Sequence, residues 1–273
     1  MCIISNSIES VSNTKILVAI NSSSNRQFTV YSNNVANTSN NNAMILPVPY
    51  PQTVKFHDLT NYKNLFDDCK KCFTSSIYRS YGLTNSTLSI NMADSLEVFN
   101  IGSYQVSLAI SLNDIKRVNS NVFTLSHGCD ELLTKEYNNP IFGFIICKLA
   151  NNKKDYHPFG YSHNIYNNML FIPTKHYHSH NNFLNENSVN ENTITDDWAH
   201  EIYLYNTTAK NNIDFLNMSN SNDRWTGENK LKLDYIDFDF GELKHFEKHK
   251  INGHHKNIDL FATIQNSKQI LVY

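Results

Sequence analysis

Short apolar runs, separated by polar and asparagine-rich stretches, dominate the chain. The runs KILVAI (residues 15–20) and RQFTVYS (26–32) flank a polar turn at 21–25, a pattern that predicts a β-hairpin. Further β-type runs occupy residues 103–110, 141–149, 159–163, 169–173 and 198–205. Strands are therefore expected to form most of the regular structure.

The run AMILPVPYP at residues 43–51 is apolar but carries prolines at 47, 49 and 51. Proline removes a backbone donor and fixes φ, which excludes a helix and disfavours a central strand. We expect an extended segment or an edge strand here.

Helical patterns are short and few. Residues 59–73 carry apolar side chains at the spacing of an amphipathic helix, 111–114 offer a helix start, and 131–137 predict a second short helix. The fold class expected is α+β, a strand-rich mixed domain with a few short helices.

The C-terminal third begins with a polar stretch, residues 179–195, that predicts a flexible loop. The run LKLDYIDFDF (231–240) alternates like a strand, 244–256 is rich in lysine and histidine and is expected to be exposed, and 258–264 and 269–273 are candidate closing strands. We expect an α+β core domain at 1–205 and a β-containing extension at 206–273 packed on it.

Composition narrows the class of protein. The chain has 273 residues, is 40% hydrophobic and 12% aromatic, and carries a formal charge of −2, so a packed core is expected and nucleic-acid binding is not. Neither an apolar run of ~18–20 residues nor a signal-peptide pattern at 1–13 is present, so no membrane association is expected. Five cysteines without a disulfide framework favour reduced thiols. A soluble cytoplasmic protein, or one within a virus-like particle, is expected.

The order of features over about residues 15–178 resembles the bacterial family domain of unknown function 2330. The matching pieces are the hairpin, the ILPVPYPQTV segment, EVFNIGSYQVSLAI followed by a helix, and FGFIICKL followed by HPFGYSH and MLFIPTKHY. The chain departs from that family in its expected lack of an export signal and a membrane anchor. The resemblance implies an architecture and transfers no catalytic residue.

Cys2 is a candidate nucleophile. If Met1 is removed, Cys2 carries both a thiol and an α-amine that can act as its base. The opening Met-Cys-Ile-Ile superficially resembles N-terminal-nucleophile hydrolases. The alternative is a small buried side chain at the start of a strand.

The histidines are candidate metal ligands. His176, His178 and His180 share one face if the segment is a strand, and His157, His163 or His200 are candidates to complete a zinc site. Because three alternate strand residues span ~13 Å, only two neighbours such as His176 and His178 can bind one ion. The alternative is a solvated loop of histidines. No cofactor is predicted, and zinc is the candidate if these residues form a site.

Other motifs are weak. Cys69 and Cys72 form a CxxC without a thioredoxin-like context. A zinc site needs a second pair, for which His127 and Cys129 are the candidates, and the favoured interpretation is two thiols one helical turn apart by chance. Phosphate-binding and nucleophile-elbow motifs are missing. The best hypothesis is a non-enzymatic binding or structural module with a protein partner, since aromatic side chains suit interfaces. The alternative is a hydrolase or amidase that uses Cys2.

Overall fold

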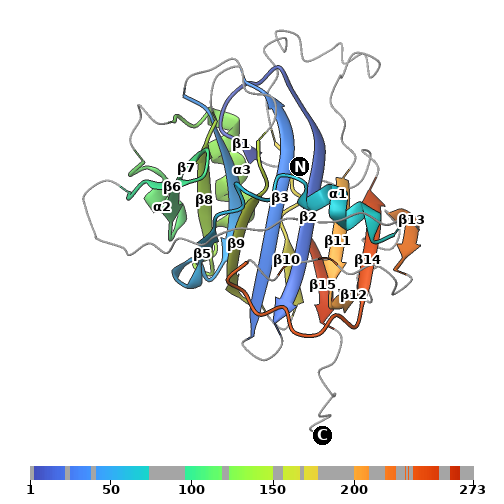
Figure 1. Ribbon diagram of the computed structural model, residues 1–273. Coiled ribbons are helices and arrows are strands. Elements are labelled where there is room, and N and C mark those ends of the chain that lie inside the picture. The colour runs from blue at the N-terminus through green and yellow to red at the C-terminus, as the bar shows by residue number, and fades with distance from the viewer. Residues whose placement is uncertain are drawn as a thin grey trace, which may run out of the picture.

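The computed structural model describes residues 3–21, 25–37, 41–73, 96–118, 123–149, 156–166, 169–177, 200–208, 219–225, 231, 233, 236–251 and 259–264. Within these ranges, strands in three sheets form most of the regular structure and the helices are short (Figure 1). The prediction of a strand-rich α+β fold is confirmed.

The largest sheet has seven strands. In spatial order they are β13 (Ser219–Arg224), β14 (Phe246–Ile251), β11 (His200–Tyr205), β2 (Ser10–Asn21), β3 (Arg26–Ala36), β9 (Phe159–Asn164) and β5 (Lys55–His57). Every pairing in this sheet is antiparallel except that of β11 with β2. The predicted hairpin is confirmed as β2–β3, and both strands extend beyond the predicted runs.

A five-stranded sheet contains β1 (Ile3–Ile4), β4 (Ala43–Pro49), β8 (Phe142–Lys148), β7 (Tyr104–Ala109) and β6 (Phe99–Ile101), in that order. A three-stranded sheet contains β10 (Met169–Ile172), β15 (Leu260–Ile264) and β12 (Thr207–Thr208). Gln27 joins β3 to β10, because its side-chain amide exchanges two hydrogen bonds with the backbone of Phe171, at 2.6 and 2.8 Å.

The helices are η1 (Pro51–Thr53, a 3-10 turn), α1 (Leu65–Lys71), α2 (Leu112–Ile115) and α3 (His127–Tyr137). The side chains of Ser111 and Ser126 cap α2 and α3 by accepting backbone N–H bonds, which satisfies donors that a helix start leaves free. Because of the cap at Ser126, α3 begins four residues before the predicted start at 131. The predicted helix at 59–73 begins only at Leu65.

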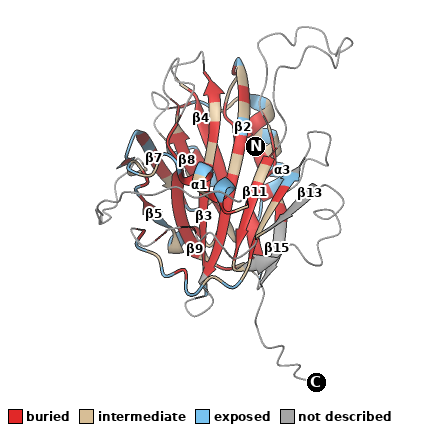
Figure 2. Ribbon diagram, turned by 45° about the vertical axis from the view of Figure 1, so that its right-hand side comes forward, coloured by how far each residue is buried: buried red, intermediate tan, exposed pale blue. Residues whose placement is uncertain are grey.

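The buried apolar residues form three clusters. Strands β3, β4, β8 and β9, which contribute to these clusters, are largely buried (Figure 2). The central cluster lies between the seven-stranded and five-stranded sheets and includes Ile16, Val18, Leu46, Val106 and Ile145. On the other face of the seven-stranded sheet, α1 packs with Leu231, Leu233, Ile236 and Phe240. On the other face of the five-stranded sheet, α2 and α3 pack over β4, β7 and β8.

The prediction of an extended segment or an edge strand at residues 43–51 is wrong where β1 covers β4, at Met44 and Ile45. Strand β4 lies between β1 and β8 and pairs with both. The amide of Ser5 donates to the carbonyl of Ala43 at 2.9 Å, so Ala43 directs its backbone groups to the β1 side. Because strand residues two apart share this direction, Pro47 and Pro49 also face that side, where β1 spans only two residues.

Two predictions for the C-terminal third are also wrong. The described residues of 231–240 are not in a strand, although the apolar ones are buried against the large sheet. Residues 246–251 form β14 rather than an exposed tail, and Phe246 and His249 are buried. Here the alternating pattern reports burial on one side, and pairing with β11 decides which segment becomes a strand.

Strands from both predicted regions share sheets, since β14 pairs with β11 and β15 pairs with β10. The division at residues 205 and 206 stays a prediction, and both 179–195 and 269–273 lie outside the described residues. In the part that the structure describes, no helix has the length and apolarity needed to cross a membrane.

Candidate functional site

Half-buried aromatic rings gather where β4, β8 and β9 end or begin. Tyr50 directly follows β4, Phe142 opens β8, and Tyr166 lies two residues after β9. The rings of Tyr50 and Tyr166 lie 6.2 Å apart, and those of Phe142 and Tyr166 5.9 Å apart. Met169, which is 37% exposed, donates its backbone N–H to the carbonyl of Tyr166 at 2.8 Å. We call Tyr50, Phe142, Tyr166 and Met169 the aromatic surface.

The backbone of Tyr50 is in the left-handed region, with φ 50° and ψ 57°. This conformation costs a non-glycine residue roughly 1–2 kcal/mol and is uncommon for a bulky one. Hydrogen bonds hold it in place: Tyr50 N–H donates to the carbonyl of Ile141 at 2.8 Å, and the Tyr50 carbonyl accepts from the N–H and Oγ1 of Thr53. The fold therefore holds one ring of the aromatic surface in a strained but well-supported position.

Arg26, the first residue of β3, lies beside the aromatic surface. Its Nη2 donates to Ser162 Oγ at 2.9 Å and to the Thr53 carbonyl at 3.0 Å, and its Nη1 donates to Asn164 Oδ1 at 3.3 Å. Thr53 also bonds to Tyr50, and Asn164 lies two residues before Tyr166. The guanidinium and the aromatic rings are thus fixed by the same short segments.

Two polar residues of the neighbouring strand β5, Lys55 and His57, also lie in this region. Lys55 of β5 is exposed and lies opposite Ser162 of β9. His57 Nε2 lies 3.0 Å from Ser162 Oγ, and burial lowers the pKa of His57 to about 4, so its ring is neutral near pH 7. Ser162 Oγ accepts from Arg26, so this oxygen links the guanidinium to the His57 ring.

The contact between Ser162 and His57 has the geometry of a nucleophile and its base. A nucleophile must be reached by the substrate, and Ser162 is only 1% exposed. Its oxygen also accepts a hydrogen bond from the Arg26 guanidinium, which disfavours loss of electron density to a substrate. This contact is therefore explained as a buried polar link that positions Arg26.

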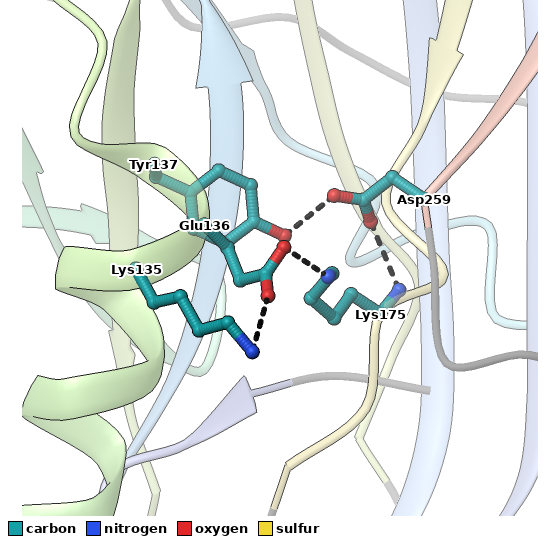
Figure 3. A network of polar contacts seen from close by, with 5 residues as sticks. All are labelled: Lys135, Glu136, Tyr137, Lys175 and Asp259. Atoms are coloured by element: carbon teal, nitrogen blue, oxygen red, sulfur yellow. Dashed lines mark hydrogen bonds and ion pairs between the residues drawn. The ribbon is translucent and has the colours of Figure 1, made fainter.

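A second polar network joins α3 to the segments beside β10 and β15 (Figure 3). The Tyr137 hydroxyl donates to Asp259 Oδ2 at 2.5 Å, and the Lys175 backbone N–H donates to Asp259 Oδ1 at 2.9 Å. Lys175 Nζ lies 2.7 Å from Glu136, which Lys135 also approaches at 3.8 Å. Burial raises the pKa of Asp259 and of Tyr137. These bonds connect three separate segments, which gives the network a structural role.

Two residues proposed from the sequence, Cys2 and His178, lie outside the described residues, as does His180. The nucleophile hypothesis for Cys2 therefore stays a prediction. Intact-mass spectrometry tests it, since retention of Met1 leaves Cys2 without a free α-amine.

The remaining candidate zinc ligands are dispersed. His157 uses both ring nitrogens, since Nε2 accepts from the N–H of Ser103 at 2.9 Å and Nδ1 bonds to the carbonyl of Pro158 at 2.8 Å. His163 of β9 and His200 of β11 are separated by β3 and β2, which places their strands about 14 Å apart. His176 is buried after β10. Among the described residues, no group of three or more ligand side chains is arranged to hold a metal ion.

The cysteines considered as zinc ligands, Cys69 and Cys72 on one side and Cys129 on the other, lie in different layers. Cys69 and Cys72 pack between α1 and the seven-stranded sheet, whereas Cys129 packs under α3 on the far face of the five-stranded sheet. Burial raises the pKa of Cys72 to about 11 and that of Cys129 to about 12. The structure does not bring these thiols together.

Sequence reasoning missed Arg26, Tyr50 and Tyr166. Two signals were present: Tyr50 stands between two prolines, and Arg26, one of only four arginines, opens a predicted strand. Neither signal shows that the two residues lie in one region, because that depends on the long-range pairing of β3 with β9.

No family model matches the chain. A crystal structure of baculovirus P35 matches it at 14% identity, covering 97% of this chain and 100% of that one, with a TM-score of 0.47. A mutated P35 after caspase cleavage matches at 12% identity, covering 93% and 100%, with a TM-score of 0.46. A caspase-8/P35 complex matches at 10%, covering 93% and 97%, with a TM-score of 0.44. Likeness at this level establishes neither a shared fold nor a shared function, and the resemblance to domain of unknown function 2330 stays a prediction.

Proposed function

We propose that this protein is a non-enzymatic binding module that docks a protein partner on the aromatic surface. The observation that supports this most is the grouping of three half-buried aromatic rings, an exposed methionine and a fixed arginine. Tyrosine, phenylalanine, methionine and arginine are the residues enriched at protein interfaces, and tyrosine and arginine are frequent among those that carry the binding energy.

The hydrogen bonds that hold the segments around Tyr50, Tyr166 and Arg26 strengthen the proposal. Hydrogen bonds fix the backbone that carries Tyr50 and Tyr166. The Arg26 guanidinium is held by three acceptors and therefore loses little conformational freedom when a partner binds. The strained backbone of Tyr50 is retained at the same place, and such strain clusters at functional sites.

Affinity capture from lysate of the source cells tests the proposal. Tagged wild type is compared with a Tyr50→Ala/Tyr166→Ala variant and with Ile110→Ala, a control that truncates a 55% exposed apolar side chain outside the aromatic surface. We expect one set of proteins to be captured by wild type and by the control and to be lost from the double variant. Capture of the same set by all three would contradict the proposal.

A purified bait removes the dependence on lysate. Caspase-8 is a convenient first bait, because one of the matched crystal structures is a complex of caspase-8 with P35. The choice of bait adds no support of its own. Only binding that the double variant loses and Ile110→Ala keeps counts in favour of the aromatic surface.

We also propose that the protein works in the cytoplasm. The four described cysteines are buried thiols and not part of a disulfide, as expected in a compartment that keeps thiols reduced. Cell fractionation with an antibody against the protein tests this location, and recovery in the secreted fraction would contradict it.

A further inference from the structure

We infer that the partner presents a carboxylate of an acidic side chain to Arg26 and Lys55, next to the aromatic surface. This inference rests on the proposed function and names the chemistry of the segment that docks there. It concerns residues that lie beside the four members of the aromatic surface.

The Arg26 guanidinium donates hydrogen bonds to three described acceptors. Its three acceptors, Ser162 Oγ, the Thr53 carbonyl and Asn164 Oδ1, are all neutral. A guanidinium carries five N–H donors, so the described contacts use three of them. In the described part of the chain, no carboxylate forms an ion pair with Arg26, although burial removes water from the cation and so lowers its pKa.

A second cation, Lys55, lies on the strand next to β9. Lys55 lies on the same face of the sheet as Arg26, because Lys55 is opposite Ser162 and Arg26 is opposite Asn164, two residues further along β9. Both cations lower the pKa of His57, in addition to the larger effect of its burial, while Asp237 raises it. Arg26 and Lys55 therefore place two cations on one face of the sheet, opposite Asn164 and Ser162 of β9.

The aromatic rings near Arg26 favour a protein segment over a free anion as the ligand. A carboxylate bonded to a fixed arginine forms charge-assisted hydrogen bonds. Thr53 bonds to both Arg26 and Tyr50, and Tyr166 lies two residues after Asn164, so the segments that hold Arg26 also carry the two rings. A free anion gains nothing from those rings, whereas an acidic residue between apolar or aromatic ones contacts both.

Two peptide pools test the inference by fluorescence anisotropy. Both pools are fluorescein-labelled, acetylated and amidated hexapeptides of apolar and aromatic residues, and they differ only in one central residue, glutamate or glutamine. We expect wild type to bind the glutamate pool about tenfold to a hundredfold more tightly, the range of a charge-assisted hydrogen bond. Equal binding of the two pools, or binding of neither, would overturn the inference.

Variants assign the effect to the residues. Arg26→Gln should remove the preference for glutamate, Arg26→Lys should keep part of it, and Ile110→Ala should leave it unchanged. Melting temperatures show whether Arg26→Gln is folded. If it is not, Lys55→Gln decides, because Lys55 is exposed, and a reduction of the preference of about twofold to fivefold is expected from a solvent-screened charge.

The failures of the two proposals are distinguishable. If both pools bind equally and Tyr50→Ala/Tyr166→Ala abolishes the binding of both, the proposed docking on the aromatic surface is supported and the carboxylate inference is overturned. If sodium phosphate or acetate at the peptide concentration displaces the glutamate pool completely, the site recognises a free anion and the inference also falls. If the double variant captures the same proteins from lysate as wild type, the proposed function is itself contradicted.

Discussion

At the scale of single residues, burial of His57 and His163 gives a clear pH dependence. Burial lowers the pKa of each ring to about 4, from an ordinary value near 6.5. Between these values the unfolded chain binds more protons than the folded one, so stability is full above pH ~6.5 and is lost as the pH falls toward 4.

His57→Gln tests this directly. Glutamine can still bond to Ser162 but does not titrate, so the loss of unfolding free energy between pH 6.5 and 4 should shrink by up to about 3 kcal/mol. Urea unfolding at several pH values measures it. An unchanged slope would show that His57 is not held in its neutral form.

Asp259 is expected to act in the opposite direction. Burial raises the pKa of its carboxyl group, more than bonds from Tyr137 and Lys175 lower it. A group with a raised folded pKa contributes stability that is fully present below its unfolded pKa, near 3.8, and is lost as the pH rises through the folded value.

Asp259→Asn should therefore remove this loss. The asparagine carbonyl can accept from the Lys175 N–H, and its amide can donate to the Tyr137 oxygen, so the geometry of Figure 3 is kept without the charge. Chemical unfolding should show a smaller deficit for the variant at pH 7 than at pH 4, or a net gain. A larger deficit at pH 7 would show that the ionised carboxylate stabilises the fold.

At the scale of elements, the turn between β6 and β7 depends on a glycine. Gly102 has φ 57°, and a Cβ there would clash with Thr60 Oγ1 and with His157 Nε2. Gly241 has nearly the same φ, 60°, but a Cβ there meets no atom within 4 Å. The two positions separate backbone strain from a steric clash.

Gly241→Ala should cost about 1 kcal/mol of unfolding free energy, the penalty for a left-handed alanine. Gly102→Ala should cost about 1–3 kcal/mol more, because His157 and Thr60 must also move. Denaturant titrations of both variants provide the comparison. Equal losses would show that this turn adapts without strain.

The elements that the sequence predicted well are those whose pattern is local. The hairpin β2–β3, the strand β8 and the capped helices follow from runs of neighbouring residues. The errors at β4, 231–240 and β14 share one cause. Whether an extended run becomes a central strand, a covering segment or an edge depends on which distant strand pairs with it, and no local pattern carries that information.

At the scale of the whole molecule, the same reasoning explains why the candidate site was missed. Its residues come from β3, the ends of β4 and β9, and the starts of β8 and β10, which are adjacent only after the sheets form. The candidates predicted from the sequence, in contrast, are mostly residues that lie close together along the chain. The described histidines and cysteines among them are dispersed over several layers, and Cys2 stays a prediction.

Docking of a protein partner on the aromatic surface is the central claim, and site-specific photo-crosslinking tests it most directly. A photoreactive phenylalanine analogue placed at Tyr166 should crosslink to the partner in source cells, and the same analogue at Ile110 should not. The crosslinked product at position 166 should also disappear when Tyr50→Ala is added. Crosslinking from Ile110 with none from Tyr166, or equal crosslinking from both, would contradict the account.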